Sequence, residues 1–154
     1  MQESFFDLFH NTSFWAGLVS WGVAQCTKMI CALIKTRRLD FSYIVSTGGM
    51  PSAHSAMVSG LATSIGLNNG FGSGLFVVAL AFAMVVMFDA STVRRAAGMQ
   101  ARLLNDIVDE LFKEHKLSEQ KLAELLGHTR LEVFMGMTMG ILVGLLVHSL
   151  LFLY

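Results

Sequence analysis

Long apolar stretches without charge constrain the fold of this chain more than any other feature. Only 14% of its 154 residues are charged and 54% are hydrophobic, whereas a soluble domain carries roughly 25% charged residues. A helix needs about 20 apolar residues to cross a bilayer, and four segments approach or exceed that length, at about 14–34, 52–67, 71–88 and 131–153. The sequence therefore predicts an all-α, polytopic membrane bundle of about four transmembrane helices, in a single domain over residues 1–154.

The basic residues predict how this bundle is oriented. All eleven Lys and Arg lie within 28–38 or 94–130. The two short middle spans, divided only by residues 68–70, separate these blocks and therefore return the chain to the same side. By the positive-inside rule that side is the cytoplasm, and both termini face outward. The formal net charge is zero, which gives no support for a nucleic-acid partner.

The segment between the third and fourth spans, residues 91–127, is polar enough to leave the bilayer. From Val93 to Leu111 apolar residues recur at helical spacing, with charged residues largely opposite them. This pattern predicts an amphipathic helix that either continues the third span or lies at the membrane interface. A second helix is expected at about 119–126. Both would belong to a helical segment on the cytoplasmic side.

The last span carries a pattern of small residues at every fourth position, formed by Gly136, Gly140 and Gly144. Such a pattern lets another helix approach closely. The partner helix would come either from the same bundle or from a second copy, as in a homo-oligomer assembled through these glycines.

The stretch STGGMPSAHSA, residues 46–56, opens the second span. Its glycine pair allows a tight backbone path, and Pro51 suits the first turn of a helix. Ser52 and His54 then fall where helix N–H groups lack intrahelical partners, which favours an anion site, particularly for phosphate. The alternative is an ordinary capped start of a membrane helix, with His54 among the lipid headgroups.

The stretch FDASTVRRAAGMQA, residues 88–101, closes the third span. Asp89 ends the apolar run, and Arg94 and Arg95 follow within about two helical turns. An arginine can hold a phosphate through charge-assisted, bidentate hydrogen bonds, and Asp89 would orient it or bind a metal. The alternative is a basic flank that serves only as a topology signal.

The stretch LLGHTRLEV, residues 125–133, opens the last span. Glu132 lies one helical turn after His128, and a carboxylate at this spacing can orient a histidine and make it a better nucleophile or base. Thr129 and Glu132 also fit the capping box S/T-x-x-E, so a capped helix start with an interfacial histidine is the alternative.

Gln25 and Lys28 share one face of the first span. Lys28 either reaches toward the interface along its own stem or belongs to a functional site, which is the default hypothesis for an ionisable residue within a span. The four polar features all fall at the same expected membrane face. Independent topology and capping signals would not require this convergence, so it favours one polar site.

Taken together, STGGMPSAHSA, FDASTVRRAAGMQA and LLGHTRLEV, in this order and spacing, resemble the divergent branch of the type 2 phosphatidic acid phosphatase family. That branch is also described as related to acid phosphatases and vanadium-dependent haloperoxidases. The resemblance extends from about residue 24 to residue 154. It implies a helical membrane enzyme that removes phosphate from a lipid or other phosphate ester without a metal.

The resemblance also implies roles for two histidines. The family motif P-S-G-H is matched by PSAH at 51–54, so Ser52 would contact phosphate and His54 would be the general acid. The H-x3-acid part of the motif S-R-x5-H-x3-D is matched by His128 and Glu132, so His128 would be the nucleophile and Glu132 would orient it.

Phosphate contacts complete the implied site. The motif's own arginine is not present six residues before the nucleophile, so Arg94 or Arg95 would supply it from a distance. The family's K-x6-R-P motif is matched only by Lys28, with Lys35 seven residues later and no proline. Lys28 would bind phosphate, with Gln25 in a supporting role.

The sequence thus predicts a membrane phosphatase for a lipid phosphate or diphosphate, polyprenyl lipids included, with its site on the cytoplasmic side. Its partners would be this substrate and the surrounding lipids. No cofactor is expected, and the alternative is a divalent metal held by Asp89 and Glu132. Two rival functions are a non-catalytic lipid- or anion-binding or transport protein that retains the phosphate site, and a structural membrane subunit.

Overall fold

The computed structural model describes residues 5–37, 49–111 and 127–152, and this part of the chain forms helices and turns without a strand. A short 3-10 helix comes first and α-helices follow: η1 (Phe5–His10), α1 (Thr12–Thr36), α3 (Ala53–Asn69), α4 (Gly74–Ser91), α5 (Val93–Leu111) and α6 (Arg130–Phe152). The all-α fold class is thereby confirmed. The helix expected at 119–126 lies outside the described residues.

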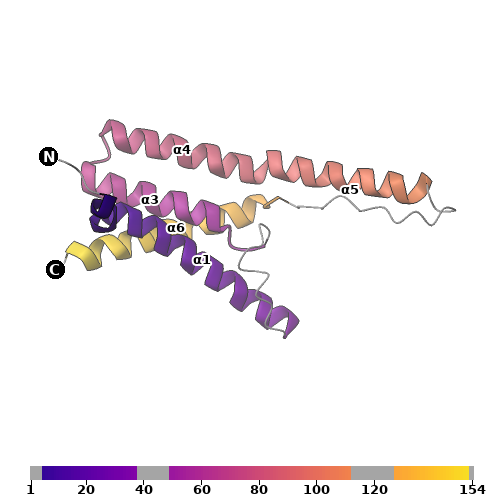
Figure 1. The fold of residues 1–154 in the computed structure, drawn as a ribbon, viewed down its shortest axis with the longest axis horizontal. Helices are drawn as coiled ribbons and strands as arrows, with labels where there is room; N and C mark the ends of the chain where they lie inside the picture. The colour runs from indigo at the N-terminus through magenta and orange to yellow at the C-terminus, as the bar shows by residue number, and fades with distance from the viewer. Residues whose placement is uncertain (1–4, 38–48, 112–126, 153–154) are drawn as a thin grey trace.

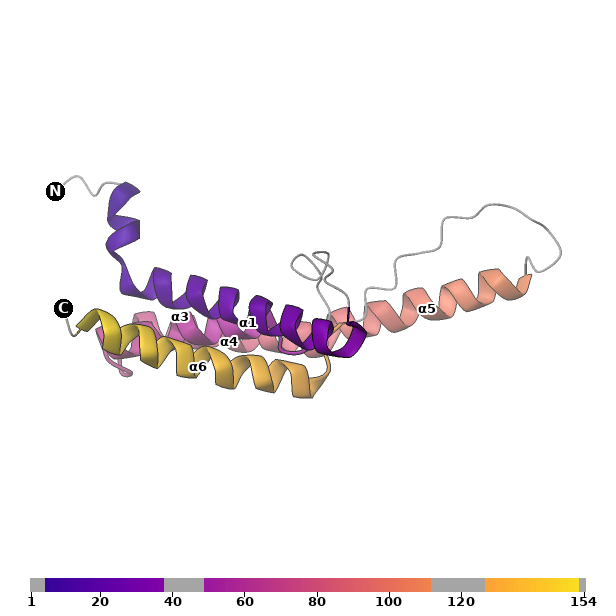
Figure 2. The same ribbon diagram turned by 90° about the horizontal axis from the view of Figure 1, so that it is seen from below.

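Four of these helices lie side by side, with α3 between the others (Figures 1 and 2). α3 packs against α1, α4 and α6, and α1 also packs against α6, whereas within the described ranges α1 makes no contact with α4. α1 and α4 end where α3 and α6 begin. We call this the basic end of the bundle, because the segments that contain all the Lys and Arg residues border it. The chain termini lie at the opposite, far end.

α3 is the shortest and least apolar of the four helices. It has nine buried residues, of which eight are Ala, Gly or Ser, so its three neighbours can approach closely. Buried hydroxyls must be satisfied inside a membrane bundle, and Ser64 Oγ accordingly lies 3.1 Å from Ser13 Oγ of α1. α1, α4 and α6 are each long and apolar enough to cross a membrane, and they flank the more polar α3.

The three glycines of α6 form its contact surface with α3. A β-carbon at Gly140 would lie 2.9 Å from Ala56 Cα, and one at Gly144 would lie 2.9 Å from the Gly60 carbonyl oxygen. At Gly136 it would collide with the carbonyl oxygen of Ser52. The two backbones therefore touch directly, and the glycine stripe packs within the chain.

α4 and α5 follow one another along nearly the same line, and α5 extends beyond the basic end (Figure 1). The break between them is at Thr92, whose Oγ1 and N–H both donate to the Phe88 carbonyl, at 2.6 and 3.0 Å. Of the two positions expected for the amphipathic helix, the structure has the one that continues the third span. Only Ala83 and Ala90 of α4 are buried, so most of this apolar helix is left for lipid.

Candidate functional site

The start of α6 holds the first part of the site. Glu132 Oε2 accepts from Thr129 N–H at 3.0 Å, and Thr129 Oγ1 accepts from Glu132 N–H at 3.3 Å, which confirms the capping box. The same Oε2 lies 3.1 Å from Nδ1 of His128. One carboxylate therefore both caps the helix and fixes the imidazole, which is only 3% exposed.

The start of α3 holds the second part. Ser52, which is fully buried, is the N-cap, and its Oγ accepts from Ser55 N–H at 3.4 Å and from Ser55 Oγ at 3.0 Å. The expectation that Pro51 lies in the first helical turn is therefore wrong. Proline suits either position, but the hydroxyl of Ser52 can close the helix end and Pro51 has no N–H to contribute. Gly49, with φ of +91°, makes the turn that leads into this cap.

Backbone hydrogen bonds join the two helix starts to each other and to the end of α4. Ser52 N–H donates to the Glu132 carbonyl at 3.0 Å, and His128 N–H donates to the Ala90 carbonyl at 3.1 Å. The contact at Gly136 lies one turn further along α6, where a β-carbon would be 3.0 Å from Ser55 Cβ. His128, Glu132 and Ser52 are thus held in one region by main-chain contacts, which do not depend on side-chain rotamers.

Lys28 brings α1 to the same region. Its side chain is buried, with 4% exposure, and its Cγ and Cδ lie about 3.7 Å from where a β-carbon of Gly49 would be. It is close enough to Glu132 for the two charges to interact. Gln25, one turn earlier, is half-buried. A buried lysine near a carboxylate at the end of a span is typical of a functional site rather than of a headgroup anchor.

The other expected site residues border this region. His54 lies in the first turn of α3 and is exposed, while Asp89 is half-buried in the last turn of α4, next to the Ala90 carbonyl that binds His128. Arg94 and Arg95 fall in the first turn of α5, and the side chain of Arg95 is exposed. The structure therefore brings His128, Glu132, Ser52 and Lys28 together, and leaves contacts of the arginines with phosphate as a prediction.

Two contributors to the site escape sequence reasoning. The carbonyl of Ala90 fixes the backbone of His128, and no side-chain pattern reports on such a tertiary main-chain contact. Ser55 shares a hydrogen bond with Ser52, and the only signal for it is the S-x-x-S spacing at the helix start.

The donor set for a metal is limited. In residues 5–37, 49–111 and 127–152, no three His, Cys, Asp or Glu side chains come together in a way that could hold an ion. What this region offers is an oriented imidazole, a buried ammonium group and a helix start whose N–H groups and positive dipole end favour an anion.

Comparison with known proteins agrees with this combination of fold and motifs. No solved structure matches the chain. It is 41% identical over 150 residues to the uncharacterized membrane protein YuiD of Bacillus subtilis (strain 168), an alignment that covers 90% of this chain and 95% of the relative. Residues 9–143 match the family described as "Divergent PAP2 family", and the chain, a membrane protein, therefore belongs to that family.

Proposed function

We propose that the protein is a membrane phosphatase that hydrolyses a lipid phosphate or diphosphate. The observation that carries this proposal is the hydrogen bond from the buried His128 to Glu132, at the point where the start of α6 is bonded to the start of α3. With Glu132 ionised, its oxygen accepts from Nδ1–H. The lone pair of the imidazole is then on Nε2, which is the form a nucleophilic histidine needs.

The proposed reaction has two steps. In the first, Nε2 of His128 forms a bond to phosphorus while the bond from phosphorus to the lipid oxygen breaks, and His54 donates a proton to that oxygen. In the second, water attacks the phosphohistidine, His54 accepts its proton, and phosphate leaves. Glu132 stabilises the imidazolium that forms in between.

Charge on the phosphoryl oxygens would be held by groups at the basic end. Lys28 provides a buried ammonium, the start of α3 provides N–H groups behind the Ser52 cap, and Arg94 and Arg95 stand at the start of α5. Fixed donors of this kind act on developing charge without reorganising. Since the site is at the end of a membrane bundle, a substrate whose tail stays in lipid reaches it directly.

The test is turnover by purified protein in detergent, with phosphate release measured over a panel of lipid phosphates. His128→Ala should lower kcat by at least about a hundredfold and leave substrate binding largely intact, because its role is specific to the transition state. Glu132→Gln should lower kcat by less, since it keeps the side chain's shape and loses only the charge.

His148→Ala is the matched control, because this histidine also belongs to α6 but lies near the far end. It should retain turnover. A phosphohistidine trapped by acid quench in the wild type and missing in His128→Ala would establish the covalent step. Full activity of His128→Ala would end the proposal, and binding of lipid phosphate without turnover by the wild type would favour the non-catalytic binding or transport function.

A further inference from the structure

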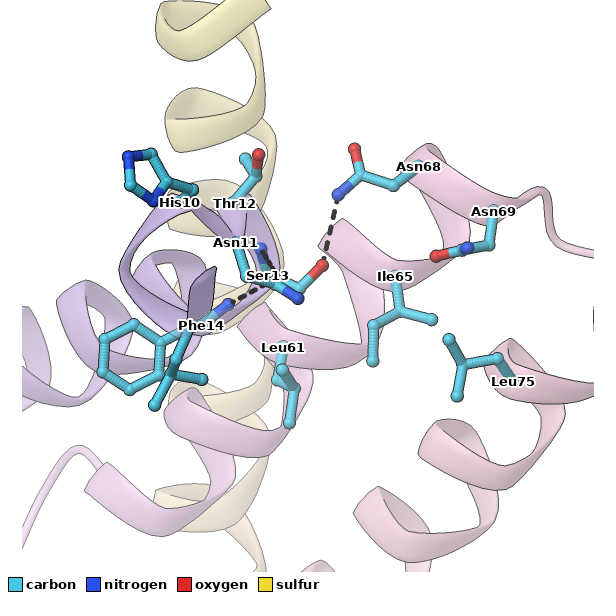
Figure 3. A pocket seen from close by; sticks show the side chains of 11 residues that line it. His10, Asn11, Thr12, Ser13, Phe14, Leu61, Ile65, Asn68, Asn69 and Leu75 are labelled. Atoms are coloured by element: carbon cyan, nitrogen blue, oxygen red, sulfur yellow. Dashed lines mark hydrogen bonds between the residues drawn. The ribbon is translucent and has the colours of Figure 1, made fainter. Parts of the chain in front are cut away.

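A pocket of about 580 Å³ lies at the far end of the bundle, among α1, α3 and α4 (Figure 3). Its volume is within the range of ligand pockets, about 300–1,000 Å³. Apolar side chains from three elements line much of it, namely Phe14, Leu61, Ile65 and Leu75. None of its lining residues is Lys, Arg, Asp or Glu, so the pocket does not suit a phosphate group.

Polar side chains border the pocket but are tied to one another. The Asn68 amide donates to Ser13 Oγ at 3.2 Å and to Ser64 Oγ at 3.4 Å, and Figure 3 shows Asn68 reaching across to α1. Ser13 and Ser64 are themselves in contact at 3.1 Å. Because these groups bond to each other, they join α1 to α3 at the far end and leave the apolar side chains as the main binding surface.

The face of α3 that lines this pocket also carries a candidate catalytic residue. Residues 54, 61, 65 and 68 are spaced by seven, four and three positions, which places them on one side of a helix. His54 is exposed at the basic end of this face, and Leu61 and Ile65 are half-buried further along it. The same helix face therefore runs from the proposed active site to the pocket.

The walls of this face are α1 and α4. Both pack on α3, but in the described part of the chain they do not contact each other, so no other helix of the bundle covers the strip of α3 between them. α1 approaches this strip closely at Gly17, where a β-carbon would lie 3.4 Å from Leu61 Cβ. The strip is thus accessible from the bilayer.

The spacing along the strip fits the dimensions of a lipid. Leu61 is seven residues and Ile65 eleven residues from His54, which corresponds to about 10 and 16 Å along the helix axis. One half of the hydrocarbon core is about 15 Å thick. A lipid with its phosphate at the basic end would therefore place the end of its tail next to Leu61 and Ile65.

We propose that the substrate's hydrocarbon tail lies along this face of α3, between α1 and α4, with its end in the far-end pocket. The inference rests on the proposed function and adds to it a substrate class, namely phosphates of long, unbranched or prenyl chains. Apolar contact in the pocket would favour such chains over short ones, since each buried methylene adds to binding.

Hexadecyl phosphate and butyl phosphate test this by the ratio of their kcat/KM values. Ile65→Trp fills the pocket, and we expect it to lower this ratio about tenfold, the loss expected when two methylenes are displaced from apolar contact, without changing butyl phosphate hydrolysis. Val78→Trp, on the lipid-exposed face of α4, is the matched control and should keep the wild-type ratio. Leu75→Trp replaces Ile65→Trp if the latter does not give folded, monodisperse protein.

A second measurement does not require turnover. A hexadecyl phosphate with a photoreactive group at the end of its tail should crosslink to the peptides that contain Leu61, Ile65 or Leu75. Crosslinking to the outer face of α4 alone, or an unchanged ratio in Ile65→Trp, would overturn the tail site. Absence of hydrolysis by any of the proteins, together with crosslinking in the pocket, would refute the phosphatase proposal but not the tail site.

Discussion

Replacing Gly140 by alanine tests the packing on which the whole site depends. The three atoms nearest to the added β-carbon would be the carbonyl oxygen, the carbonyl carbon and Cα of Ala56, the last two at 2.9 Å. All three belong to the backbone of α3 and cannot rotate away. The methyl group therefore has to push α6 away from α3 along their shared surface.

The magnitude follows from two opposing contributions. Overpacking a tight contact costs about 1–3 kcal/mol, and a contact against backbone belongs in the upper half of this range. Alanine in place of glycine returns up to about 1 kcal/mol of helix propensity. The net destabilisation is about 1–2 kcal/mol, which for a chain of this size lowers Tm by about 2–8 °C.

The assay is thermal unfolding of purified protein in one detergent, followed by the fluorescence of the tryptophans in α1. Gly22→Ala is the matched control, because a β-carbon at Gly22 meets no atom within 4 Å and the substitution gains only helix propensity. It should match or exceed the wild-type Tm. If Gly140→Ala were as stable as Gly22→Ala, the direct contact of α6 with α3 would be refuted.

Two further predictions concern sidedness and metal dependence. In a background with Cys26 and Cys31 replaced by serine, Asp40→Cys and Lys116→Cys should both be labelled from the cytoplasmic side by a membrane-impermeant reagent, and opposite sidedness would separate the motifs by a bilayer. Chelator should leave phosphate release unchanged, and Asp89→Asn should be less damaging than His128→Ala; equal damage together with loss of activity in chelator would instead support metal-assisted hydrolysis.

Features that depend on a few neighbouring residues were predicted from the sequence. The capping box at Thr129 and Glu132 is a local pattern, and the structure confirms both of its hydrogen bonds. The same spacing brought His128 to Glu132, because residues four apart on a helix start are neighbours. The start of α3 was less certain, since Pro51 and Ser52 are both compatible with an early helical position and only the contacts of the Ser52 hydroxyl decide between them.

Tertiary arrangement was harder to predict. The apolar patterns predict that four helices exist, but they do not show that α3 lies between the other three. Its serines and glycines read as weak hydrophobicity in the sequence, whereas in the bundle they are the small surfaces on which α1, α4 and α6 pack. The bond from His128 N–H to the Ala90 carbonyl is likewise a product of the fold, because neither partner uses its side chain.

The glycine stripe also has a consequence for the proposed chemistry. Gly136 is the first glycine of the stripe, and its close approach to Ser52 lies one turn from the bond between Ser52 N–H and the Glu132 carbonyl. Glu132 in turn fixes His128. The separation between the phosphate-binding start of α3 and the nucleophile is therefore set by how closely two backbones can pack, and a side chain larger than hydrogen at position 136 would change that separation before it changed any catalytic group.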